Sequence, residues 1–208
     1  MFFRNLTLFR FPELPRRALS AFDKHLADHR LRPCGPIEMA TQGFVSPFGR
    51  DSEELTHRVG KNTLFCLGGE DKLLPSSVIS EALAVKIGEI TEKEARRVSA
   101  RERKRLKEEV LTDLLPRAFV KPSRTFAWLT EDSGWLVIDT ASRKLAEAVV
   151  SQLREALGRF PATPMAPSDS PRSLMTDWLV GGKLPSGLGW GDECELRDPV
   201  EAGAIVKC

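Results

Sequence analysis

The stretch RTFAWLTEDSGWLVID, residues 124–139, carries the clearest structural signal in the sequence. Two runs rich in aromatic and aliphatic residues flank the polar stretch EDSG, an arrangement typical of a β-hairpin. Apolar residues then recur at helical spacing over 141–157, which predicts an amphipathic helix. Because two adjacent strands precede a helix, with few signals of parallel crossovers, the order favours an α+β fold with antiparallel sheets and packed helices.

The region before this hairpin predicts further strands and one helix. Residues 2–11 have an aromatic and aliphatic bias with partial alternation, which predicts a strand. Leu19, Phe22 and Leu26 lie on one face of a helix expected over 16–30. Bounded by Gly and Pro residues, further strands are expected over 38–49, 54–59 and 62–68, the last two around a turn.

A helix is predicted over 73–87. Ser76 or Ser77 would be its N-cap, and Gly88 is expected to interrupt it. No motif of a nucleotide-binding loop or of a serine nucleophile accompanies these serines, so we interpret them as caps.

A second helix follows and is predicted to stop before Pro116, because proline cannot continue a helix. Thr91 and Ser99 each have a glutamate three residues later, the spacing of a capping box. The helix is therefore expected to begin at one of these two positions.

The chain has 208 residues, enough for one large domain or two small ones with a sizeable core. Its composition, 41% hydrophobic and 29% charged, is that of an ordinary soluble globular protein. We recognise no signal peptide and no apolar run that could span a bilayer, so we expect a cytoplasmic protein without membrane contact. We expect four regions: an N-terminal α+β region over 1–72, a helical basic segment over 73–122, a hairpin–helix region over 123–160, and an acidic Pro/Gly-rich region over 161–208.

Charge is segregated along the chain, although the net charge is only +2. Residues 161–208 hold four cations and seven acids, a local charge of −3. Residues 96–124 hold ten cations and four acids, a local charge of +6. Such asymmetry can indicate a nucleic-acid face. The ten cations are Arg96, Arg97, Arg101, Arg103, Lys104, Arg105, Lys107, Arg117, Lys121 and Arg124.

The basic helix has an apolar stripe only in its second half, where Leu106, Val110 and Leu114 share one side. Arg103 and Lys107 occupy that side one turn earlier. The first turns are therefore polar all round, and we expect them to project from the domain. An arginine can donate two hydrogen bonds in a fixed fork, which suits phosphate. Two interpretations stay open, an ordinary solvated helix and a surface that binds a polyanion.

Six short motifs occur in an order that resembles the RdgC family, the recombination-associated proteins of Gram-negative bacteria. They are EMATQGFVSP (38–47), KLLPSSV (72–78), LLPRAF (114–119), GWLVIDTAS (134–142), MTDWL (175–179) and CELRDP (194–199). The resemblance spans the whole chain, with the basic helix before the LLPRAF motif. Members of the family continue well past the position of Cys208, so closure of a ring by this chain stays open.

The resemblance implies an α+β protein that binds double-stranded DNA without sequence specificity and forms a ring-shaped homodimer. It also implies a nucleoid-associated role in DNA recombination, in which RecA-promoted strand exchange is restrained. Carried over to this sequence, Arg101, Arg103, Lys104, Arg105 and Lys107 become candidate DNA contacts. Phe119 fits either a core position or an apolar contact point, and the resemblance makes it a candidate dimer contact.

The family has also been labelled an exonuclease, so a metal-dependent nuclease is the alternative function. Such an enzyme needs several carboxylates held together around one or two Mg²⁺ ions. The local acidic pairs are Glu131/Asp132 and Asp192/Glu193, and no spaced carboxylate cluster accompanies a strand. We therefore expect a binding protein without catalytic residues, metal or cofactor.

Histidine and cysteine spacing gives no strong metal signal. His25 and His29 are four residues apart on a predicted helix, but without a clear third ligand we interpret both as solvent-facing. The four cysteines are far apart in the sequence and form no C-x-x-C pair, which favours reduced thiols over a disulfide framework.

Overall fold

The computed structural model describes residues 3–12, 21–198, 200–201 and 203–208. The chain forms two compact units, residues 1–165 and 166–208. The expected α+β class is confirmed, because antiparallel sheets and helices make up the described chain. The predicted start of the first strand and Leu19 of the first predicted helix lie outside the described residues.

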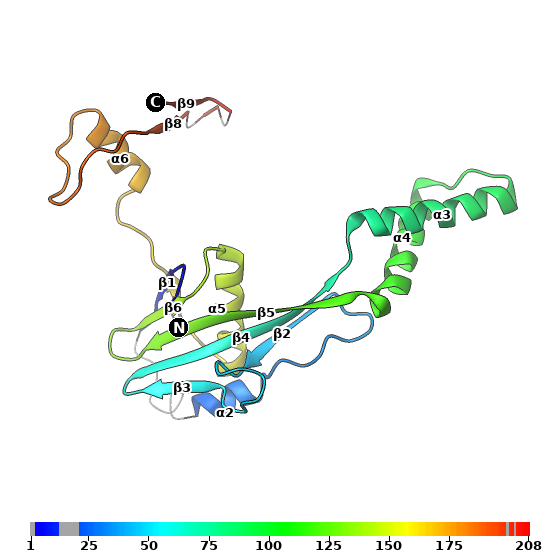
Figure 1. The fold of residues 1–208 in the computed structure, drawn as a ribbon, viewed down its shortest axis with the longest axis horizontal. Coiled ribbons are helices and arrows are strands. Elements are labelled where there is room, and N and C mark those ends of the chain that lie inside the picture. The colour runs from blue at the N-terminus through cyan, green and yellow to red at the C-terminus, as the bar shows by residue number, and fades with distance from the viewer. Residues whose placement is uncertain (1–2, 13–20, 199, 202) are drawn as a thin grey trace. The chain divides into compact units, whose positions relative to one another are not determined.

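The first unit is built on an antiparallel sheet of seven strands (Figure 1). The strand order is β2–β4–β5–β6–β1–β7, and β3 pairs with the same edge of β4 as β2 does. The long central strands β4 and β5 pair along their whole length, from Asn62↔Thr130 to Leu73↔Phe119. The strands are β1 Thr7–Arg10, β2 Ala40–Val45, β3 Thr56–Val59, β4 Asn62–Leu73, β5 Phe119–Thr130, β6 Trp135–Ile138 and β7 Thr163–Pro164.

The predicted hairpin over 124–139 is confirmed as β5 and β6, and the helix after it is α5, Arg143–Leu157. Ser142 caps α5 by accepting a hydrogen bond from the backbone N–H of Leu145. The helix ends at Gly158, whose positive φ of 70° suits glycine. Its buried face joins the sheet and the short helix α2, Phe22–Ala27, in one hydrophobic core. The predicted regions 1–72 and 123–160 therefore share one core, while the region 73–122 adds only strand ends to the sheet.

A close backbone crossing holds the edge strand β2. Leu31 donates a hydrogen bond to the carbonyl of Phe44, and Phe44 donates one to the carbonyl of His29. Gly43 of β2 pairs with Gly68 of β4, and a Cβ on Gly43 would lie 2.4 Å from the backbone nitrogen of Leu31. The crossing therefore requires glycine at position 43 because a side chain would collide with backbone.

The helical segment between β4 and β5 differs in detail from its prediction. The first helix, α3, runs from Ser76 to Glu94, and Pro75 rather than a serine is its N-cap. Gly88 does not interrupt α3, since a single glycine weakens a helix without breaking it. Thr91 lies inside α3, where its hydroxyl donates to the carbonyl of Ile87.

The second helix, α4, runs from Ala100 to Leu114 with Ser99 as its N-cap. Of the two predicted helix starts, the one at Ser99 is therefore correct, and the Ser99 hydroxyl accepts from the backbone N–H of Glu102. Pro116 lies in a single 3₁₀ turn, η1, Leu115–Arg117, before β5 begins. The expected stop is confirmed.

The second unit contains helix α6, Pro171–Leu179, and a two-stranded ribbon of β8, Glu195–Arg197, and β9, Ile205–Lys207. No residue from 166 onward is buried, within the part of this unit that the structure describes. No helix among the described residues has the length and apolar character needed to cross a bilayer.

Candidate nucleic-acid interface

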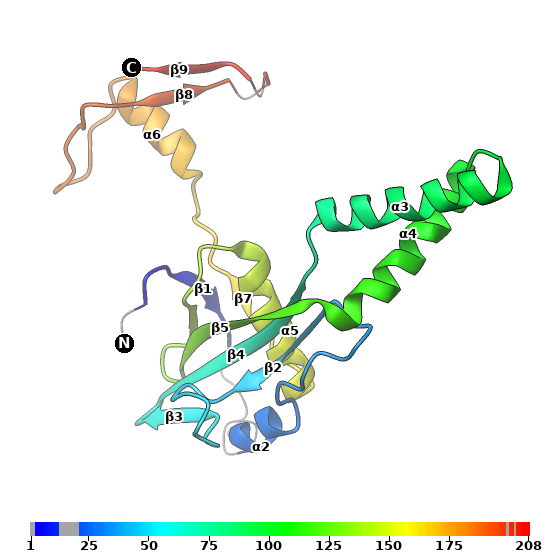
Figure 2. The same ribbon diagram turned by 45° about the vertical axis from the view of Figure 1, so that its right-hand side comes forward.

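The helices α3 and α4 pack on each other as an antiparallel pair (Figure 2). Leu83 of α3 and Leu106 and Val110 of α4 are buried. Beside this apolar seam, Lys86 Nζ lies 3.0 Å from Glu109 Oε2 and 3.7 Å from Asp113 Oδ2. The Leu106–Val110 stripe predicted from sequence therefore packs against α3. Projection of α4 from the rest of the domain stays a prediction.

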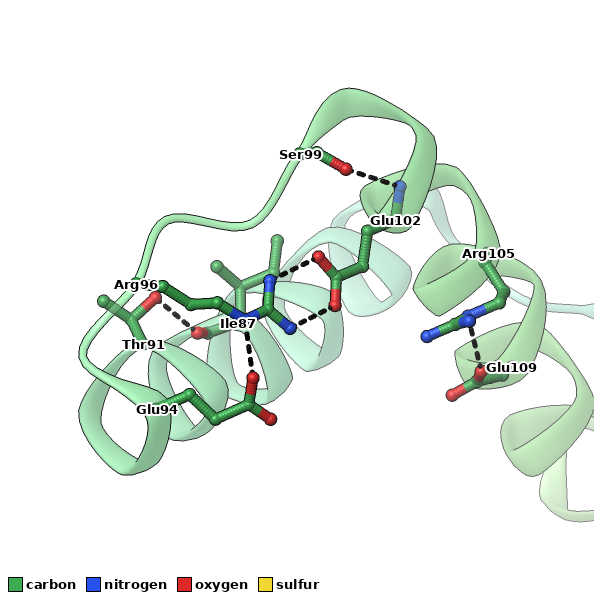
Figure 3. Close-up of polar contacts among 8 residues, drawn as sticks. All are labelled: Ile87, Thr91, Glu94, Arg96, Ser99, Glu102, Arg105 and Glu109. Atoms are coloured by element: carbon green, nitrogen blue, oxygen red, sulfur yellow. Dashed lines mark hydrogen bonds and ion pairs between the residues drawn. The ribbon is translucent and has the colours of Figure 1, made fainter.

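Arg96 fixes the turn between the two helices (Figure 3). Its guanidinium donates two hydrogen bonds of 2.7 Å to the carboxylate of Glu102 and one of 2.6 Å to Glu94. The hydrogen bonds from Arg96 are the main cause that lowers the pKa of Glu102 to about 2. They also raise the pKa of Arg96 above its already high ordinary value. Arg96 thus holds the hairpin together, and its donors already face carboxylates.

Five cations of the same hairpin are exposed and carry no ion pair with any described residue: Arg97, Arg101, Arg103, Lys104 and Lys107. Arg105 is different, because its Nε lies 3.5 Å from Glu109 Oε1, although its side chain is 70% exposed. An exposed pair of this kind is weak and can open to accept another anion.

Three of the four acids of the basic segment are already paired with cations. Glu102 binds Arg96, while Glu109 and Asp113 lie against Lys86 of α3. Only Glu108 of the four acids in 96–124 carries no ion pair among the described residues. Pairing thus engages three of these four acids, while α3 adds four further acids to the hairpin, Glu81, Glu89, Glu92 and Glu94.

Three of the unpaired cations form a stripe along α4. Arg101, Lys104 and Lys107 are spaced by three residues, so successive side chains are about 60° apart around the helix and about 4.5 Å apart along it. Phosphates along one DNA strand advance about 3.4 Å per nucleotide. The stripe therefore presents three exposed cations within about 9 Å along the helix axis.

The remaining predicted cations lie at the base of the hairpin or on the sheet. Arg117 belongs to the 3₁₀ turn, and Lys121 lies opposite Asp71 in the β4–β5 ladder. Arg124 donates a hydrogen bond to the carbonyl of Ser46 and lies 5.9 Å from the ring of Phe126. The ten predicted residues thus divide between the hairpin and the strand that follows it.

Phe119 begins β5, directly opposite Leu73 of β4. Its side chain is 83% exposed, which excludes the core position that the sequence left open. Leu73, directly opposite Phe119, is also exposed, so the two side chains place apolar surface on one face at the base of the hairpin, whereas the exposed Val120 points to the other face. Such a patch is suited to an apolar partner surface.

Lys72 ties this base to the sheet and was not recognised in the sequence. Its Nζ donates to the carbonyl of Leu115, at 2.7 Å, and to the carbonyl of Pro36, at 3.0 Å. Because both partners are backbone atoms far away in the chain, no local motif signals the contact. Lys86 was missed for the same reason, since its carboxylate partners belong to a different helix.

The acidic pair of the β5–β6 turn is engaged by cations. Glu131 lies 3.0 Å from Arg58 Nη2, and Asp132 lies 2.5 Å from Lys61 Nζ. Within the described ranges, no three His, Cys, Asp or Glu side chains gather as metal ligands would. His29 lies beyond the end of α2, and both His25 and His29 are partly buried, so the prediction of two solvent-facing histidines on one helix is wrong. His29 Nδ1 instead lies 3.1 Å from the carbonyl oxygen of His25.

Comparison with known proteins places these features in a family. The family model described as "Putative exonuclease, RdgC" matches residues 1–208. The chain belongs to the RdgC family. The "Recombination-associated protein RdgC" of Xanthomonas axonopodis pv. citri is 50% identical over 209 residues, covering 100% of this chain and 69% of that protein. The protein of the same name from Stenotrophomonas maltophilia is 49% identical, with the same coverage.

Membership in the RdgC family confirms the resemblance read from six motifs. Two of these motifs flank the α3–α4 hairpin, because KLLPSSV ends β4 and starts α3 while LLPRAF joins α4 to β5. In this RdgC-family chain, the motifs thus correspond to the structural junctions that position the exposed cations and Phe119.

Proposed function

We propose that this RdgC-family chain binds double-stranded DNA without sequence specificity, through the exposed cations of the α3–α4 hairpin. One observation carries the proposal: Arg97, Arg101, Arg103, Lys104 and Lys107 have no ion pair among the described residues, while three of the four acids in 96–124 pair with other cations. Cations that carry only counterions can exchange them for phosphates, which favours binding.

The binding is proposed to be independent of sequence because the hairpin supplies charge rather than base readout. Phosphate contacts fix position and affinity, whereas sequence is read at base edges or through DNA shape. Arg105 adds to the surface when its weak contact with Glu109 opens. Lys121, Arg117 and Arg124 extend the proposed surface from the hairpin towards the sheet.

The biological role follows from the relatives, which are named recombination-associated proteins. We propose that the chain acts in recombination by occupying duplex DNA in the cytoplasm, at the nucleoid, and so restrains RecA-promoted strand exchange. Phe119 and Leu73 are proposed to contact a second copy, giving a homodimer that encloses DNA in a ring. A second copy suits this patch because exposed apolar surface is stabilised by removal from water.

The family description also names an exonuclease, so the proposal must separate passive binding from cleavage. Glu131 and Asp132 already face Arg58 and Lys61, an arrangement that neutralises both carboxylates rather than leaving them for Mg²⁺. We therefore propose binding without catalysis.

Two labelled duplexes of unrelated sequence test the proposal. Equal affinity for both is expected, and end-labelled duplex should keep its length with Mg²⁺ or Mn²⁺. A strong preference for one sequence would contradict binding through phosphates alone. Shortened product that disappears in a Glu131→Gln/Asp132→Asn double variant would replace passive binding with nuclease activity.

A further inference from the structure

Cys194 and Cys208 lie opposite each other at one end of the β8–β9 ribbon, although 13 residues separate them in the sequence. The backbone N–H of Cys194 donates to the carbonyl of Cys208 at 2.9 Å, and the N–H of Cys208 donates to the carbonyl of Cys194 at 3.0 Å. Two residues that exchange both hydrogen bonds form a directly opposed antiparallel pair, with Cα atoms about 5.5 Å apart.

This geometry suits a covalent bond between the two sulfurs. Disulfides usually join Cα atoms about 4.4–6.8 Å apart, so the expected spacing of an opposed pair falls inside that range. Directly opposed residues also project their side chains to the same face of a ribbon. The next rung, Glu195↔Lys207, is held by an ion pair of 3.4 Å between Lys207 Nζ and Glu195 Oε2, which keeps the register.

We propose that Cys194 and Cys208 are a thiol oxidation site, at which hydrogen peroxide joins the two side chains in an intrachain disulfide. The exposed Cys208 thiolate attacks one oxygen of the peroxide and becomes a sulfenic acid, while the other oxygen leaves as hydroxide. The Cys194 thiolate then attacks the Cys208 sulfur and expels the second hydroxide. Two electrons pass from the sulfurs to the peroxide, and with the two thiol protons the products are one disulfide and two water molecules.

The other two cysteines are differently placed. Cys66 is buried in β4, where burial raises the pKa of its thiol. The Cys34 thiol donates a hydrogen bond to the carbonyl of Glu38 at 3.3 Å. At the ribbon, partial burial raises the pKa of the Cys194 thiol, and the neighbouring Cys208 thiol raises it further. Oxidation should therefore accelerate as pH rises, because the thiolate is the nucleophile.

Peptide mapping of the oxidised full chain tests the site. The chain is treated with hydrogen peroxide, free thiols are alkylated, and the denatured protein is digested with trypsin without reductant. We expect the peptide 184–197, which contains Cys194, to be linked to the tryptic peptide that contains Cys208, with a mass two hydrogen atoms below the sum of the two peptides. At a fixed excess of hydrogen peroxide, tenfold dilution of the protein should leave the first-order rate constant of linkage unchanged. Dithiothreitol should reverse the link.

Matched variants make the result specific. Cys34→Ser should keep the link, whereas Cys194→Ser and Cys208→Ser should each abolish it. Alkylation of both Cys194 and Cys208 after peroxide treatment of the wild-type chain would overturn the proposal. A tenfold fall in the fraction of chains linked per unit time on tenfold dilution would also overturn it, because the bond would then join different chains. These outcomes do not depend on DNA binding.

Discussion

The guanidinium of Arg96 and the carboxylate of Glu102 form two hydrogen bonds of 2.7 Å across the turn between α3 and α4. Glu102 is the third residue of α4, and Ser99 caps the same turn. The turn thus uses one cation of the basic segment to fix the helix that presents the others. Among the ten predicted contact residues, Arg96 thus has a structural role, because its guanidinium binds two carboxylates across the turn.

Stability should depend on this pair in a defined pH range. The pKa of Glu102 is lowered from an ordinary 4.5 to about 2, so its ionised form is favoured in the folded state. The contribution is fully present above pH 4.5 and is lost as pH falls towards 2. The difference in free energy of unfolding between wild type and Glu102→Gln, measured by urea denaturation, should shrink over that range.

Glu108→Gln is the matched control, because Glu108 is an exposed glutamate on the same helix without an ion pair among the described residues. Its substitution should change stability less than Glu102→Gln does at neutral pH. Equal effects of the two substitutions at every pH would contradict a specific role for the Arg96–Glu102 pair.

Gly88→Ala should stabilise the chain by about 0.5–1 kcal/mol, because alanine loses less conformational entropy than glycine in a helix. Gly88 lies inside α3, and a Cβ there would meet no atom within 4 Å. The midpoint of denaturant unfolding reports the effect. A lower midpoint would mean that α3 does not continue through position 88 in solution.

Gly43→Ala should do the opposite. The new methyl group would collide with the backbone of Leu31, so we expect a loss of about 1–3 kcal/mol, typical of overpacking. The same denaturation assay measures it. Unchanged stability would show that the crossing of residues 30–31 over β2 is looser than the structure indicates.

Phe119→Ala should convert a dimer into a monomer with little change in the stability of the single chain. The exposed side chain loses few contacts within its own chain, and surface substitutions usually change stability by less than about 0.5 kcal/mol. Molar mass by light scattering measures the assembly. Val59→Ala, at another exposed apolar position, is the control and should leave the molar mass unchanged. A wild-type chain that is monomeric at all concentrations would contradict the proposed contact.

Local signals predicted much of this fold. The β5–β6 hairpin, α5 and the cap at Ser99 follow from alternation, helical spacing and side-chain chemistry within a few residues. The length of β5 could not be predicted because it contains Pro122, which usually excludes a strand. At Pro122 the strand pairs with β4, while β6 joins its other side only from Ala127 onward, so the missing N–H can face an unpaired edge.

Long-range contacts account for most of what the sequence could not predict about the site. The basic residues were found by counting charges, but the counting treated Arg96 and Arg101 alike. Only the folded turn separates Arg96, held by two carboxylates, from Arg101, which has no ion pair among the described residues. Cys194 and Cys208 are a similar case, because a spacing of this length gives no pairing signal until the ribbon forms.

The central claim is that unpaired cations of α4 bind phosphates, and the salt dependence of duplex binding tests it most directly. Replacement of Arg101, Lys104 and Lys107 by alanine should weaken binding to every sequence. It should also reduce the slope of log affinity against log salt by up to about one unit per lost contact. Replacement of Arg143, Lys144 and Arg159, three exposed cations of α5 and its end, removes the same charge as a control. Equal slopes and affinities for the two triple variants would contradict the claim.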